Sequence, residues 1–69
     1  MLADVHRRRA AHLERLAFYQ ANAAKNYPDP ATVGGEDLGA FLVLRGGVLA
    51  ERAGIAWCDE ILQTLEAER

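Results

Sequence analysis

The stretch FLVLRGGVLAERAGIAWCDEIL, residues 41–62, decides the fold of this 69-residue chain. It reads as helix because apolar side chains recur along it at helical spacing, yet it contains Gly46, Gly47 and Gly54. Each glycine inside a helix costs about 1 kcal/mol relative to alanine. Some packing must offset this cost, and the only tryptophan and the only cysteine, Trp57 and Cys58, follow these glycines.

The helix predicted over residues 36–67 is apolar around most of its circumference. A broad stripe is bordered by apolar flanks, and only a narrow polar strip is left to face water. The stripe holds Phe41, Leu44, Val48, Ile55, Leu62 and Leu65, the flanks hold Leu38, Leu42, Leu49, Val43, Trp57 and Ile61, and the strip holds Arg45, Arg52, Asp59 and Gln63. A helix that is apolar nearly all round must be buried nearly all round.

An amphipathic helix is predicted before it, over residues 3–27. Its apolar stripe consists of Leu2, Val5, Leu13, Leu16, Ala17, Ala23, Ala24 and Tyr27. Phe18 lies outside this stripe, either as part of a second contact surface or as an ordinary exposed aromatic. Pro28 and Pro30 end the helix, because proline disfavours the α conformation in the residue before it. We therefore predict an all-α, single-domain fold of two long antiparallel helices, joined by a Pro/Gly-rich link over residues 28–35.

The size of the chain predicts a partner. A core of this size rarely gives more than about 3–5 kcal/mol without a disulfide, a metal or another chain. One cysteine cannot close an internal bridge, and no Cys and His have zinc-ligand spacing. The first helix covers only one side of the second, so we expect a second copy of the chain to cover the rest.

Small residues indicate which side of the second helix meets that copy. At 100° per residue, Gly39 and the three glycines of the opening stretch fall on the side that carries Val43, Trp57 and Ile61. Small side chains let another backbone approach closely. The predicted dimer interface consists of Phe41, Leu42, Val43, Gly46, Gly47, Leu49, Ala50, Gly54, Trp57 and Ile61.

The overall charge argues against a direct nucleic-acid ligand. Eight Lys and Arg against ten Asp and Glu give a net charge of −2, so no excess of positive charge is available to hold a phosphate backbone. The only basic run, at residues 7–9, is typical of a solvated helix face. The longest apolar run, residues 40–44, is far too short for a membrane span. A lone thiol fits a reducing cytoplasm.

Residue types with chemical reactivity do not form a recognisable catalytic or metal site. His6 and His12 lie six residues apart, about 240° around a helix, so they cannot share a metal ion and are expected at the surface or its edge. Cys58 is expected to be a small buried hydrophobe rather than a nucleophile. We therefore predict no enzyme activity, no cofactor and no metal.

The order of residues resembles a known regulator domain. The segment from Phe41 to Leu62 is similar to the last helix of the C-terminal domain of PadR-family transcription regulators, in the subgroup called the virulence-activator alpha type. The step Leu44-Arg45-Gly46-Gly47 and the run from Ile55 to Glu60 carry most of the likeness. The segment HRRRAAHLERLAFY, residues 6–19, is similar to the preceding helix of that family.

The resemblance implies a homodimerisation domain. In that family an N-terminal winged helix reads DNA, and the C-terminal helices pair two subunits. It also implies that Trp57 packs between helices at or near the dimer contact. In some members of that family the dimer interior accepts small aromatic or drug-like effectors, so Trp57 is a candidate effector contact as well. No winged helix fits into these residues. The chain is therefore expected to be either the dimerisation part of a longer regulator or a stand-alone protein that forms a heterodimer with a full-length regulator.

Overall fold

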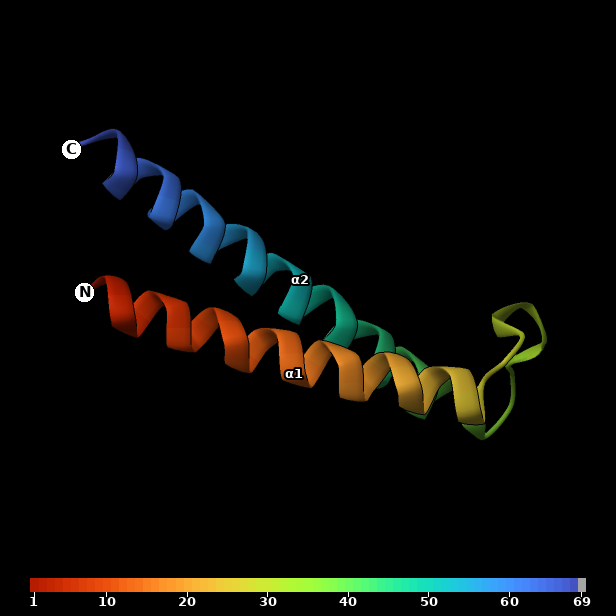
Figure 1. Ribbon diagram of the computed structural model, residues 1–69. Coiled ribbons are helices and arrows are strands. Elements are labelled where there is room, and N and C mark those ends of the chain that lie inside the picture. Colours follow the sequence, from red (N-terminus) through yellow and green to blue (C-terminus); the bar gives the residue numbers. More distant parts are fainter. Residues whose placement is uncertain (69) are drawn as a thin grey trace.

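Two long helices and a short link make up the fold, and the computed structural model describes residues 1–68. Helix α1 spans Leu2–Asn26, the 3-10 helix η1 spans Pro30–Thr32, and α2 spans Asp37–Ala67. The chain reverses direction at the link, so the start of α1 and the end of α2 lie at the same end of the molecule (Figure 1). The prediction of an all-α fold with two long helices is confirmed.

Helix α1 ends where the first proline follows it. Tyr27, which precedes Pro28, leaves the helical conformation with φ −135° and ψ 63°, although its N–H still donates to the Ala23 carbonyl at 2.8 Å. The side chain of Asp29 then accepts a hydrogen bond from the N–H of Ala31 at 3.2 Å and caps η1. The prolines and this cap therefore fix the exit from α1.

The entry into α2 depends on Gly35. Its φ of 60° lies in the left-handed region, which a residue with a side chain rarely adopts. The turn around it is closed by hydrogen bonds from the N–H of Asp37 to Gly34 O (3.3 Å) and from the N–H of Leu38 to Gly35 O (3.4 Å). Asp37 then places a negative charge in the first turn of α2, where the helix dipole favours it.

The core between the two helices is thin. Within residues 1–68, only three apolar side chains are buried, Val5 from α1 and Val48 and Cys58 from α2, and no side chain is less than 2% exposed. The shape explains this, since the molecule measures 53 × 15 × 15 Å and is one helix pair thick. The single hairpin therefore leaves many apolar side chains of α2 exposed.

An aromatic pair closes the hairpin beside the link. The rings of Tyr27 and Phe41 meet edge to face, with centroids 5.5 Å apart and an interplanar angle of 70°. This arrangement brings the positive edge of one ring to the negative face of the other. It fixes the end of α1 against the start of α2.

Candidate functional site

The outer face of α2 gathers several exposed apolar side chains of the hairpin. We define this outer face as Leu42, Val43, Gly46, Leu49, Ala50 and Trp57, with Leu38 at its edge. Val43 is 78% exposed and Trp57 is 60% exposed, and Leu38, Leu42 and Leu49 are also exposed. No charged residue stands among the six positions of the face. Large side chains therefore surround a low centre made by Gly46 and Ala50.

The predicted interface residues divide between this face and the α1 side of the helix. Six of the ten form the outer face, and Ile61 is half-buried beside it. Phe41 is half-buried and packs on Tyr27 within the chain. The predicted residues are thus brought together only in part, and their role in a dimer remains a prediction.

Gly47 and Gly54 do not lie on the outer face, so the predicted glycine side must be corrected at these positions. A Cβ built on Gly47 would lie 3.1 Å from Cε2 of Tyr19, and one on Gly54 would lie 2.5 Å from Cε1 of His12. At Gly46, by contrast, no atom lies within 4 Å of the added Cβ. Gly47 and Gly54 therefore make room for two rings of α1, and Gly46 alone of the three faces outward.

Trp57 borders a shallow hollow near the end of α2. The hollow has a volume of about 330 Å³ and is lined by Trp57, Glu60, Ile61, Thr64 and Leu65. All five belong to α2, so α1 contributes nothing to its walls. A flat ligand here would be covered on one side only unless another chain closed the hollow.

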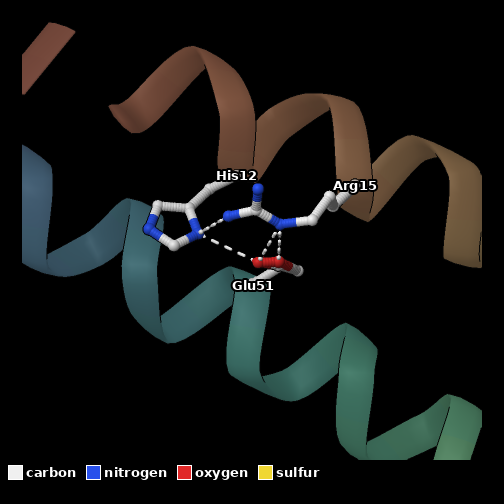
Figure 2. A network of polar contacts seen from close by, with 3 residues as sticks. All are labelled: His12, Arg15 and Glu51. Carbon is white, nitrogen blue, oxygen red and sulfur yellow. Dashed lines mark hydrogen bonds and ion pairs between the residues drawn. The ribbon is translucent and has the colours of Figure 1, made fainter. Parts of the chain in front are cut away.

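A polar cluster joins the middle of the two helices (Figure 2). Glu51 is only 7% exposed and accepts from Arg15 Nε at 3.0 Å on Oε1 and at 2.9 Å on Oε2. His12 Nδ1 lies 2.9 Å from Glu51 Oε1 and 3.2 Å from Arg15 Nη2. An ionised carboxylate only accepts, so Nδ1 carries a proton and donates to Glu51. The Arg15–His12 approach is then a contact between two donors and not a hydrogen bond.

These contacts stabilise the charged forms of Glu51 and Arg15. The hydrogen bond from Arg15, followed by that from His12, lowers the pKa of Glu51 below its ordinary value of 4.5. The same bond to Glu51 raises the pKa of Arg15. Nearer the chain ends, Arg9 Nε donates to Asp59 Oδ1 at 2.6 Å, and this bond raises the pKa of Arg9. The cluster thus fixes the register of α1 on α2 through charged pairs.

This cluster was not predicted from the sequence. His12 was expected at the surface or its edge and Asp59 in the polar strip of the second helix, and the structure has His12 half-buried on Glu51 and Asp59 paired with Arg9. Glu51 was not singled out at all. Glu51 could have indicated the cluster, because this acidic residue stands between Val48 and Gly54 on a helix where most neighbours are apolar. Its partners lie 36 and 39 residues away, so only the folded hairpin reveals them.

The hollow beside Trp57 does not reach the polar cluster, since none of its lining residues is His12, Arg15 or Glu51. Within residues 1–68, no three His, Cys, Asp or Glu side chains group closely enough to hold a metal ion. Over the same residues, neither helix has the length and apolar character needed to cross a membrane.

Comparison with known proteins identifies the domain. Residues 1–66 match the family described as virulence activator alpha C-term. A Mycobacterium tuberculosis (strain ATCC 25618 / H37Rv) protein described as a probable transcriptional regulator is 36% identical over 61 residues, covering 88% of this chain and 32% of that protein. The chain thus spans about a third of that relative's length. No solved structure matches this chain. Since the family match runs through both helices, the chain belongs to the virulence activator alpha C-terminal family, a domain of transcriptional regulators.

Proposed function

We propose that this chain is the homodimerisation domain of a PadR-like transcription regulator and has no enzyme activity. The observation that carries the proposal is the outer face of α2, where large side chains stay exposed around Gly46 and Ala50. Contiguous exposed apolar patches on small proteins mark interaction sites. The thin core also supports dimerisation, because a single hairpin gains little stability unless the outer face is covered.

A second copy is the natural occupant because the outer face is complementary to itself. A two-fold dimer uses the same patch on both subunits. Val43 and Trp57 lie seven positions before and after Ala50, so two antiparallel α2 helices crossing at Ala50 would place each Val43 beside the other copy's Trp57. Gly46 and Ala50 would let the backbones approach, and the larger side chains would fill the space on either side.

The proposed mechanism is geometric. The mycobacterial relative is about three times as long as the matched region, which leaves room for a DNA-reading domain outside it. A dimer of this C-terminal domain would hold two such readers at a fixed separation, as two half-sites on DNA require. Such a protein works in the cytoplasm, where its one thiol, Cys58, stays reduced.

The hollow beside Trp57 gives the dimer a place for an effector. In the single hairpin it is lined by α2 alone, and a second copy packed on the outer face would supply the missing wall. An aromatic ring at such a seam can hold a flat ligand by stacking. A ligand that fits one packing of the two copies better than another would shift the population between them.

The proposal is tested by placing a charge on the outer face. Val43→Glu should convert the dimer into a monomer, because a carboxylate would be buried in the interface without a partner. Phe18→Glu is the matched control, since Phe18 is 66% exposed on α1 and should leave the dimer intact. Size-exclusion chromatography with light scattering measures both. A dimer that survives Val43→Glu, or is lost with Phe18→Glu, would contradict the proposal.

A further inference from the structure

A groove runs along one side of the hairpin, near the link. It has a volume of about 310 Å³ and is formed jointly by α1, η1 and α2, and we call it the side groove. Its lining consists of Gln20, Ala23, Tyr27, Pro30, Phe41, Leu44, Arg45, Val48 and Arg52. None of these residues belongs to the outer face, so the groove is a separate feature of the molecule.

The side groove is apolar at the link and positively charged farther along. Tyr27, Pro30 and Phe41 close the link end, and Leu44 and Val48 continue the apolar wall along α2. Arg45 and Arg52 are the charged residues of the lining, and they stand seven positions apart, about 10 Å along the helix axis. The groove therefore combines an apolar end with two cationic groups.

Neither arginine is neutralised within the described part of the chain. Over residues 1–68, Arg45 and Arg52 form no ion pair, whereas Arg9 and Arg15 of α1 are paired with Asp59 and Glu51. The residues three and four positions before and after each of the two are Phe, Leu, Val, Ile or Ala. Glu51, which precedes Arg52, already accepts from Arg15 and His12. Two positive charges beside an apolar surface are thus left for an external anion.

We propose that the side groove binds a small amphiphilic carboxylate, meaning an organic acid with an apolar body. The body lies against Tyr27, Phe41 and Leu44, and the carboxylate accepts hydrogen bonds from Arg52 and Arg45. Hydrogen bonds between guanidinium and carboxylate are among the strongest in proteins. The volume falls in the range of small-molecule sites, which are mostly apolar with a few placed polar groups. Such a ligand would touch both helices and the link at once.

The test is a titration of the 69-residue chain with decanoate, followed by NMR of the aromatic side chains. Decanoate should shift the ring signals of Tyr27 and Phe41 in a saturable way and leave those of Trp57 in place. Decanol has the same body without the charge, and acetate has the charge without the body, so each should bind at least 10-fold more weakly. Decanol binding as tightly as decanoate, or shifts confined to Trp57, would overturn the proposal.

Paired arginine variants complete the test. The double variant Arg45→Gln, Arg52→Gln should weaken decanoate binding at least 10-fold, and circular dichroism should show unchanged helix content, since glutamine is a good helix former. The control Arg7→Gln, Arg8→Gln alters two exposed arginines that pair with Asp4, and should bind decanoate like the unaltered chain. Equal affinity in both double variants would overturn the proposal. So would decanoate affinity that falls as protein concentration rises, because a second copy would then occupy the groove.

Discussion

Gly54 of α2 lies directly against the imidazole ring of His12 of α1. A Cβ at position 54 would lie 2.5 Å from Cε1 of that ring, a distance that real Cβ atoms essentially never show. The same ring donates through Nδ1 to Glu51, one helical turn before Gly54. The absence of a side chain at position 54 therefore allows the polar cluster to form. The contacts of this cluster offset the low helix propensity of Gly54.

Gly54→Ala should destabilise the hairpin although alanine is the better helix former. The ring of His12 would have to move away, and its hydrogen bond to Glu51 would be lost. Gly39→Ala is the control, because no atom lies within 4 Å of its added Cβ, and it should gain up to about 1 kcal/mol from helix propensity. Thermal unfolding measures both. Equal stabilisation by the two changes would show that His12 does not need the space.

Glu51 should make stability depend on pH in the acid range. Its folded-state pKa lies below the ordinary value of 4.5, so its contribution is fully present above about pH 4.5 and is lost as the pH falls through the lowered value. Glu51→Gln keeps the shape and removes the titration, so the loss of melting temperature between pH 7 and pH 3 should be smaller in this variant. Glu14→Gln, at an exposed site on α1, should keep the full pH dependence. Identical pH profiles for the two variants would contradict this role of Glu51.

Val48→Ala should weaken the fold of the hairpin itself. Val48 is 5% exposed, and removing two methyl groups from a buried site costs about 1.6 kcal/mol at roughly 0.8 kcal/mol per group. For a chain of this size that corresponds to a fall of about 6–13 °C in melting temperature. Val43→Ala removes the same groups from the outer face, so its effect should depend on protein concentration. An effect of Val48→Ala that varied with concentration would instead place Val48 at an interface between copies.

The loss of stability on truncating Trp57 and Phe18 should distinguish a residue of the dimer interface from one on ordinary surface. Both aromatics are exposed in the single hairpin, at 60% and 66%. If the outer face is buried by a second copy, Trp57→Ala should cost about 3–5 kcal/mol, as aromatic truncations in cores do. Phe18→Ala should stay within about 0.5 kcal/mol, as surface changes do. Urea unfolding at fixed protein concentration measures the difference, and a loss below about 1 kcal/mol for Trp57→Ala would leave Trp57 at the surface.

The two helices could be predicted because their signals are local. Pro28 ends α1 by restricting Tyr27, and apolar periodicity marks α2, so both features are read within one or two turns of chain. The apolar excess of α2 likewise indicated exposed surface on a hairpin, and Val43 and Trp57 are indeed exposed.

The contacts between the helices could not be predicted in the same way. Gly46, Gly47 and Gly54 fall within one half of the helix circumference, and the boundary between the α1 side and the outer face passes between them. Its position depends on where the rings of Tyr19 and His12 lie, and those rings come from the other helix. The pairing of Glu51 with Arg15 depends on the same register and appears only once the hairpin is closed.

Disulfide formation by an Ala50→Cys variant under mild oxidation tests directly whether the outer face of α2 pairs two copies. Ala50 lies at the centre of the outer face, and a two-fold contact there brings the two copies of this position within the Cα separation of up to about 7 Å that a disulfide needs. We expect Ala50→Cys to form a linked dimer rapidly. We expect no linkage for the unaltered chain, whose Cys58 is buried, or for Ala10→Cys on the exposed surface of α1. An Ala50→Cys chain that stays unlinked, or links no faster than Ala10→Cys, would contradict the claim that the outer face of α2 pairs two copies.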